Sequence, residues 1–386
     1  MARKIRRAAV IGSGVMGSGI AAHLAGVGID TLLLDIIPFD LSPAEREDRR
    51  ARNRMSVNAL AAAKKSRPPT FFNPEDAGLI EVGNLDDDLP KIKNCDWICE
   101  VIIENLEIKR KLFTRVDQYR SEGSIVTSNT SGLKIADMVE GRSDDFTRNF
   151  FVTHFFNPVR FMRLLELVAG ERTDPEVFDA MARFGADVLG KGIVFGKDTP
   201  NFVANRIGTF SIAYLLNRMG DEGFSIEELD AMFGPVTGRP KSAIFRTADL
   251  VGLDTLVHVA DNCYDALVDD EMREHFRVPD FVRQMVERGW LGQKTKGGFY
   301  KKVGKEIQAL DVRSFEYKPK EKVRNPAIGA VKGIDPVGQR IRALVAKTDD
   351  PLARFAWELT AQTLCYSARR LGEIADDVVN VDNALK

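Results

Sequence analysis

The chain has few cysteines and few histidines, four of each among 386 residues. Cys95 and Cys99 lie close together, with three residues between them, while Cys263 and Cys365 stand alone. This spacing is neither the dense framework of a disulfide-stapled secreted protein nor the paired cysteines of a zinc site. We therefore expect no bound metal and a reducing, cytoplasmic environment.

An excess of either charge is also lacking, because Lys+Arg 55 and Asp+Glu 56 leave a net charge of −1. Nothing global attracts such a chain to nucleic acid or to an anionic membrane. Residues 8–29 contain no charged side chain apart from His23, but six glycines interrupt this run and argue against a lipid-embedded helix. We expect no nucleic-acid partner, no membrane insertion, and two or three globular domains.

The same run contains a nucleotide-binding pattern. Gly12, Gly14 and Gly17 fit G-x-G-x-x-G, after a short apolar strand that ends at Ile11 and at the start of a predicted helix. The first glycine permits a tight turn, the second lets the backbone approach a pyrophosphate, and the third lets helix and strand pack closely. Asp35 follows the next predicted strand, 31–34, where a carboxylate binds ribose hydroxyls and repels a 2′-phosphate. A Rossmann-type domain that prefers NAD to NADP is predicted.

A strongly basic stretch follows over residues 46–67. Ser42, Pro43 and Glu45 have the spacing of a capping box with a first-turn proline, and predict that a helix begins there. Two interpretations stay open. The basic side chains form a solvated helix surface, or they attract the polyphosphate part of a substrate.

Polar residues gather where the predicted strands end. Glu104 and Lys109 follow an apolar strand over 97–103, and Asn129 and Ser131 lie in the SNTS sequence that ends the next strand. In an open parallel sheet, ligands bind outside the carboxyl ends of the strands. These residues are therefore candidates for cofactor contact.

FFVTHFF brings His154 to the same edge, and Glu166 lies in the middle of the apolar strand RLLELV. A carboxylate in an apolar strand needs a partner, and the nearest candidate is the histidine twelve residues earlier. A His–Glu dyad suits alcohol oxidation, because the imidazole takes the hydroxyl proton while the carboxylate fixes the tautomer. A buried structural histidine and a stray edge-strand carboxylate remain the alternatives.

The rest of the chain is predominantly helical. A helix is predicted to begin at Asp198 or Thr199 and to contain Asn205, and Ser225 and Glu228 form another capping box. Lys294 lies in the glycine-rich sequence LGQKTKGGFY. We predict a Rossmann domain over 1–198, an all-α domain over 199–301, a linker with a possible hairpin over 302–350, and a partial second helical repeat over 351–386.

Together these motifs resemble the (S)-3-hydroxyacyl-CoA dehydrogenase family of fatty-acid β-oxidation over about residues 5–301. The resemblance implies NAD as cofactor and oxidation of a 3-hydroxyacyl-CoA to a 3-oxoacyl-CoA. It implies that His154 is the catalytic base, with Glu166 as its partner. Further positions implied to contact substrate are Ser131 and Asn205, which position the reacting oxygen, and Asn157, which lines the pocket. Those implied to contact the nicotinamide half of NAD are Glu104, Lys109 and Lys294.

Two departures from the family pattern bear on the substrate. Arg160 places a cation where many relatives have a neutral residue at the pocket mouth, which leaves the acyl chain length open. The basic stretch 46–67 falls where relatives fold a helical projection that touches coenzyme A. Its sequence differs from that of short-chain members, so no individual coenzyme A ligand is assigned.

The C-terminal part repeats the beginning of the helical domain. Three residues recur at an offset of 152: Tyr214, Gly220 and Asp230 as Tyr366, Gly372 and Asp382. This resembles multifunctional β-oxidation enzymes with duplicated C-terminal domains, and it predicts a truncated second repeat and a possible homodimer through the helical domain. A different Rossmann β-hydroxyacid dehydrogenase with a lysine base, and an NAD-binding protein without catalysis, are the alternative functions.

Overall fold

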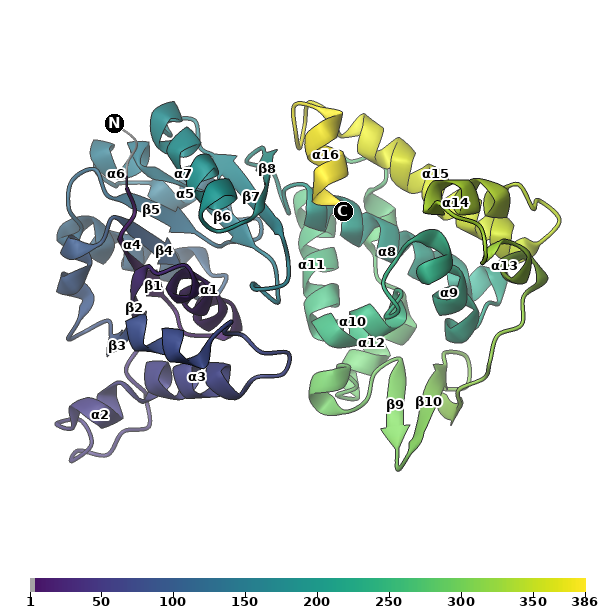
Figure 1. The fold of residues 1–386 in the computed structure, drawn as a ribbon, viewed down its shortest axis with the longest axis horizontal. Helices are drawn as coiled ribbons and strands as arrows, with labels where there is room; N and C mark the ends of the chain where they lie inside the picture. Colours follow the sequence, from purple (N-terminus) through teal and green to yellow (C-terminus); the bar gives the residue numbers. More distant parts are fainter. Residues whose placement is uncertain (1–3) are drawn as a thin grey trace. The chain divides into compact units, whose positions relative to one another are not determined.

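The computed structural model describes residues 4–386. They form two compact units, of which one joins the part of the chain up to Val203 with Leu371–Lys386 and the other is Ala204–Arg370. Figure 1 labels the elements of both units. Among the helices of residues 4–386, none combines the length and the apolar run that crossing a bilayer requires.

The first unit is built on an eight-stranded sheet in the order β3-β2-β1-β4-β5-β6-β7-β8. The strands are β1 (Arg7–Ile11), β2 (Asp30–Asp35), β3 (Ile80–Asn84), β4 (Trp97–Glu100), β5 (Ile125–Ser128), β6 (Phe150–Phe155), β7 (Leu164–Ala169) and β8 (Gly192–Gly196). All neighbours are parallel except β6 and β7, which pair antiparallel. The strand order reverses at β1, which has β2 on one side and β4 on the other. A dinucleotide binds at such a switch point.

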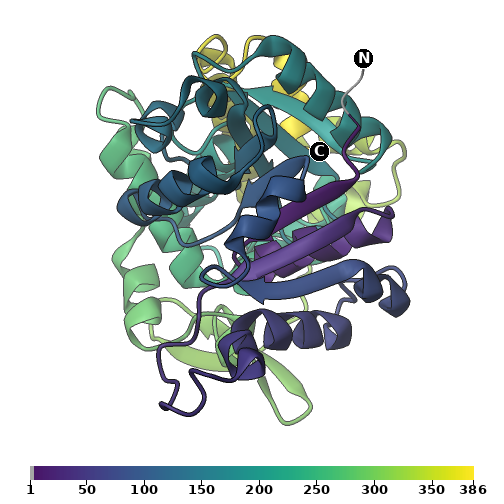
Figure 2. The ribbon, with the colours of Figure 1, turned by 90° about the vertical axis from the view of Figure 1, so that its left-hand side faces the viewer.

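Helices cover both faces of this sheet, and Figure 2 shows the strands and helices of this unit from the left-hand side of Figure 1. The helices of this unit are α1 (Val15–Gly26), α2 (Arg49–Arg52), α3 (Arg54–Lys65), α4 (Leu106–Tyr119), α5 (Ile135–Val139), α6 (Asp144–Arg148), α7 (Pro175–Asp187) and α16 (Val378–Ala384). Successive residues of β1 point to opposite faces. Ala8 and Val10 join the core beneath α1 and α7, whereas Ala9 and Ile11 join the core beneath α4.

Two predicted helix starts are wrong. Ser42 and Glu45 do form the reciprocal hydrogen bonds of a capping box, but they close only a turn, and α2 begins at Arg49 with Asp48 as its cap. The helix predicted from Asp198 begins at Ala204. Asn201 and Phe202 adopt φ values of +60° and +47°, which are incompatible with a right-handed helix.

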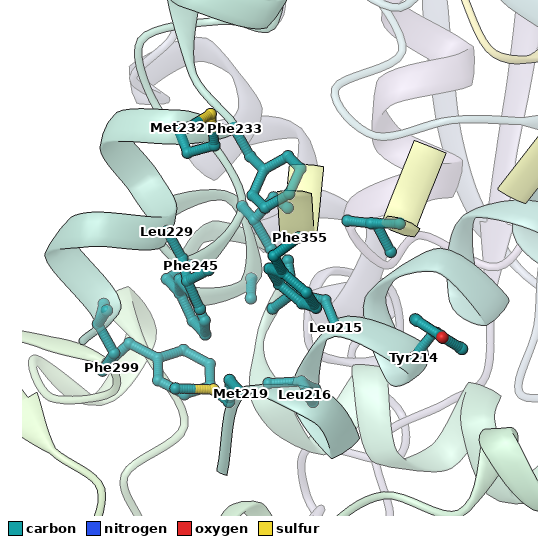
Figure 3. Close-up of a cluster of buried hydrophobic side chains, with 14 of the residues drawn as sticks. Tyr214, Leu215, Leu216, Met219, Leu229, Met232, Phe233, Phe245, Phe299 and Phe355 are labelled. Atoms are coloured by element: carbon teal, nitrogen blue, oxygen red, sulfur yellow. The ribbon is translucent and has the colours of Figure 1, made fainter. Parts of the chain in front are cut away.

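The second unit is a helical body with a small sheet. Its helices are α8 (Ala204–Glu222), α9 (Ile226–Met232), α10 (Phe245–Val251), α11 (Leu253–Ala266), α12 (Asp280–Glu287), α13 (Pro326–Val331), α14 (Val337–Val345) and α15 (Pro351–Arg369). One apolar core joins them, and Figure 3 shows the aromatic and aliphatic side chains from α8, α9, α10 and α15 that fill it. The predicted capping box of Ser225 and Glu228 is present at the start of α9.

Residues 302–350, predicted as a linker, are largely folded. The expected hairpin forms from β10 (Glu306–Asp311) and β11 (Glu316–Pro319), and β9 (Tyr300–Val303) extends it to three strands. Leu310, Val331 and Leu344 are buried in the core of this unit. This stretch therefore contributes to the stability of the helical unit.

Candidate active site

His154 and Glu166 form a buried pair. The two residues are direct partners in the β6–β7 register, and Nδ1 of His154 lies 2.6 Å from Oε2 of Glu166. Glu166 is fully buried and His154 is 4% exposed. Because an ionised carboxylate only accepts hydrogen bonds, Nδ1 of His154 is the donor in this contact. The predicted contact between the histidine and the glutamate is therefore present.

Ser131 faces the other ring nitrogen of His154. Its Oγ lies 3.3 Å from Nε2 of His154, and its backbone N–H donates to Oε1 of Glu104 at 3.0 Å. Thr130 donates its hydroxyl to the same carboxylate oxygen. Glu104 thus fixes the turn that carries Ser131, and the structure brings together His154, Glu166, Ser131 and Glu104 from among the predicted site residues.

Lys109 lies beneath this turn and is buried. Its Nζ is 2.6 Å from Oε1 of Glu100 and 3.4 Å from Oε2 of Glu104. Glu100 also accepts hydrogen bonds from the backbone N–H of Ile102 and the hydroxyl of Ser128. Lys109 therefore holds Glu104 in place, while its direct contact with a cofactor remains a prediction. Glu100 was not identified from the sequence, although a glutamate that ends an apolar strand was the available signal.

The glycine turn fits a dinucleotide pyrophosphate. Gly12 has φ +105°, and a Cβ there would lie 2.4 Å from the carbonyl oxygen of Val101. At Gly17 a Cβ would lie 1.8 Å from the carbonyl oxygen of Gly12. A Cβ at Gly14, in contrast, would have no atom within 4 Å among the described residues other than its chain neighbours. Gly14 precedes α1, and no side chain of residues 4–386 caps that helix. Its first backbone N–H groups are therefore open to an anion.

Asp35 ends β2 beside this turn. One carboxylate oxygen accepts the backbone N–H of Ser13 at 2.7 Å and also the Ser13 hydroxyl, and the other accepts the N–H of Ile36 at 2.7 Å. Asp35 is thereby held at the edge where ribose hydroxyls bind in Rossmann domains. The part played by Ser13, which lies inside the glycine motif, was not anticipated from the sequence.

Other predicted site residues have different positions. Asn129 accepts the N–H of Phe155 through Oδ1 at 2.9 Å, so its side chain ties the turn after β5 to the end of β6. Asn157 is exposed in the loop between β6 and β7. Asn205 lies at the start of α8 and Lys294 is paired with Asp254 at 2.6 Å, both in the second unit. Their roles in cofactor or substrate binding remain predictions.

Two cations hold the loop that follows Asn157. Arg160 donates to the carbonyl oxygens of Pro69 and Phe71 at 3.0 and 2.7 Å, so its guanidinium is engaged with a neighbouring loop. Lys191 is buried and donates to the carbonyl oxygens of Val159 and Met162. Burial lowers the pKa of Lys191 to about 8. Lys191 was not identified from the sequence.

Comparisons with known proteins agree with this arrangement. The model of the 3-hydroxyacyl-CoA dehydrogenase NAD binding domain matches residues 7–199, and that of the 3-hydroxyacyl-CoA dehydrogenase C-terminal domain matches residues 202–302. The chain belongs to the 3-hydroxyacyl-CoA dehydrogenase family. The predicted fold, a Rossmann-type NAD-binding domain followed by the helical domain of this family, is confirmed. Within residues 4–386, no group of three or more His, Cys, Asp or Glu side chains is arranged to hold a metal ion.

Similar members of the family differ in length. A probable 3-hydroxyacyl-CoA dehydrogenase of Bacillus subtilis is 49% identical over 392 residues, which cover 100% of this chain and 49% of that protein. A putative fatty acid oxidation complex trifunctional enzyme of Rickettsia felis is 32% identical, over 100% of this chain and 52% of its own length. The chain thus spans about half the length of these two relatives. The crystal structure of Mycobacterium tuberculosis FadB2 matches with a TM-score of 0.63 and 29% identity, over 78% of this chain and 99% of that one.

Proposed function

We propose that this chain is an NAD-dependent dehydrogenase that oxidises the 3-hydroxyl of an (S)-3-hydroxyacyl-CoA to a 3-oxo group, as a step of fatty-acid β-oxidation. The buried His154–Glu166 pair, with Nε2 of the histidine facing Ser131, carries this proposal. Membership of the 3-hydroxyacyl-CoA dehydrogenase family supports it.

In this reaction His154 is the general base. Its Nε2 takes the proton of the C3 hydroxyl, and Ser131 Oγ, 3.3 Å away, positions the substrate oxygen by a hydrogen bond. Glu166 stabilises the imidazolium that forms and is itself held by the N–H of Val203 at 3.2 Å. The Gly12–Gly17 turn and Asp35 would hold NAD, which would supply the acceptor for the hydride of C3. The family resemblance supports further proposed ligands of substrate or cofactor: Asn157, Glu104, Lys109 and Asn129 in the first unit, and Asn205 and Lys294 in the second.

The α3 end of the basic stretch is the proposed contact for coenzyme A phosphates. Arg49, Arg52 and Arg54 are paired with aspartates. Lys64, Lys65 and Arg67 are exposed at the end of α3, and no ion pair to them is found within residues 4–386. An exposed cluster without counter-charges favours the phosphate interpretation over a merely solvated surface.

We also propose that residues 351–386 are a second copy of the start of the helical domain. α9 and α16 begin and end at positions 152 residues apart, as do their caps Ser225 and Asp377. Ser211 and Thr363, also 152 apart, meet at 3.2 Å between α8 and α15. A pair of equivalent residues in mutual contact is what a local two-fold axis produces.

The contacts on either side of Ser211 and Thr363 support this relationship. The Tyr366 hydroxyl contacts Arg206, and the Tyr214 hydroxyl donates to Glu358, which is the position equivalent to Arg206.

Because α15 packs on α8 in this way, the predicted homodimer would have to use another face, such as exposed Trp357 and Leu364 on α15. Light scattering of the purified chain tests this. Cytoplasmic placement is proposed on the four free cysteines.

The reaction is tested by following NADH absorbance with acetoacetyl-CoA and with a long-chain 3-oxoacyl-CoA. Turnover with either substrate, and much less with NADPH, is expected. Binding of NADH without turnover of either substrate would contradict the proposal and favour the NAD-binding protein without catalysis.

A further inference from the structure

The segment Leu371–Lys386 folds onto the unit that contains His154 and Glu166. It lies along β8, the last strand of the sheet. The backbone N–H of Phe195 donates to Oδ1 of Asn380 at 2.8 Å, and that of Lys197 donates to the carbonyl oxygen of Ile374 at 2.9 Å. Alternate residues of an edge strand point their N–H groups to the open side, where they need partners. Leu371–Lys386 supplies the acceptors for the N–H groups of Phe195 and Lys197.

Apolar burial holds the segment in this position. Ile374 and Ala375 are fully buried, and Val381 on α16 is 2% exposed. Lys197 adds an ion pair to Asp376 at 2.6 Å, but both side chains are substantially exposed, so its contribution is small. Docking therefore depends mainly on the buried side chains and on the two edge hydrogen bonds.

Residues 197–203 connect this docked segment to the dyad. Asp198 accepts the N–H of Ile135 at 3.0 Å, and Val203 donates its N–H to Glu166. Residues 197–203 also lie against the turn that carries Ser131, because a Cβ at Gly132 would lie 2.9 Å from the backbone nitrogen of Asn201. The same stretch is thus fastened at one end to Leu371–Lys386 and contacts the catalytic carboxylate at the other.

We propose that Leu371–Lys386 is a positioning segment of the active site. By covering β8 it fixes residues 197–203, and through the Val203 amide it keeps Glu166 aligned with His154. This proposal rests on the proposed function, since it concerns the same dyad. The family models match residues 7–199 and 202–302, so Leu371–Lys386 lies outside both matched domains.

The test compares two substitutions on one helix of the 386-residue chain. Val381→Asp puts a carboxylate into the buried face of α16 and undocks it, whereas Val379→Asp changes a residue that is 61% exposed. In Val381→Asp we expect hydrogen exchange at the Phe195 and Lys197 amides to accelerate at least about tenfold. The kcat with acetoacetyl-CoA should fall about tenfold, since small displacements of catalytic groups have effects of this size. The dissociation constant for NADH should change less than about twofold, because the glycine turn is untouched. Val379→Asp should match the unmodified chain.

Asn380→Ala is the milder variant if Val381→Asp does not fold. It removes the acceptor of the Phe195 amide, and a fall of about threefold in kcat with unchanged NADH affinity is expected. Faster exchange at β8 with unchanged kcat would overturn the positioning role, and unchanged exchange in Val381→Asp would overturn the docking itself. Absence of turnover by the unmodified chain would instead contradict the proposed function, so the two failures are distinguishable.

Discussion

Glu166 stands directly opposite His154 in the antiparallel register of β6 and β7, with 2.6 Å between the carboxylate oxygen and Nδ1. Sheet hydrogen bonds between neighbouring strands therefore fix the pair, because both residues lie within strands and neither lies in the loop that joins them. In the proposed reaction, a base held in this way would keep its orientation without reorganisation at the moment of proton transfer.

Glu166→Gln should lower kcat by about 10²- to 10⁴-fold, because an amide presents a donor to Nδ1 and favours the tautomer whose Nε2 already carries a proton. NADH binding should be retained within about twofold. Steady-state kinetics with acetoacetyl-CoA and a fluorescence titration with NADH make the comparison. A kcat within threefold of the unmodified enzyme would show that the pair is structural only.

Asp35→Ser should relax the preference for NADH. The carboxylate binds ribose hydroxyls and repels a 2′-phosphate, so its removal should lower the ratio of kcat/KM for NADH to that for NADPH by about tenfold or more. Asp30→Ser, at the exposed start of the same strand, is the matched control. If the ratio stays constant in Asp35→Ser, the ribose is recognised elsewhere.

Lys109→Met should destabilise the fold by about 3–5 kcal/mol, because it leaves the buried Glu100 carboxylate without its ion-pair partner. The double variant Glu100→Gln with Lys109→Met should recover part of this loss, since no buried charge then remains. Urea unfolding measures both, and Lys111→Met on the exposed side of α4 is the control. Equal stability of Lys109→Met and Lys111→Met would refute the buried pair.

Lys191 should make stability depend on pH in a defined window. Burial lowers its pKa from 10.5 to about 8, so between these values the unfolded chain binds more protons than the folded chain. Stability relative to Lys191→Met should therefore rise as pH increases from about 8 to 10.5, and stay constant below 8. Thermal unfolding of the two proteins across this range is the measurement. If the stability of the unmodified chain relative to Lys191→Met fell or stayed constant over this pH range, burial would not disfavour the charged form of Lys191.

The glycine motif, the contact between His154 and Glu166 and the hairpin could be predicted because each has a local signature in the sequence. Gly12, Gly14 and Gly17 occur at a fixed spacing before a helix, and Glu166 interrupts an apolar strand one turn away from His154. In each case the short range of the interaction makes the spacing informative.

Glu100 and Lys191 could not be assigned because their partners are set by tertiary packing. The hydrogen bonds of Lys191 go to the backbone carbonyls of Val159 and Met162, which leave no trace in the sequence. The delayed start of α8 depends on left-handed backbone at Asn201 and Phe202, which overrides a good capping signal at Asp198. The docking of Ile374 on β8 joins residues distant in sequence and has no local pattern.

His154→Ala tests the central claim most directly. The kcat for acetoacetyl-CoA reduction should fall by at least about 10²-fold while the dissociation constant for NADH stays within about twofold, because only the proton-transfer group is removed. Turnover close to that of the unmodified enzyme would contradict the assignment of His154 as the base.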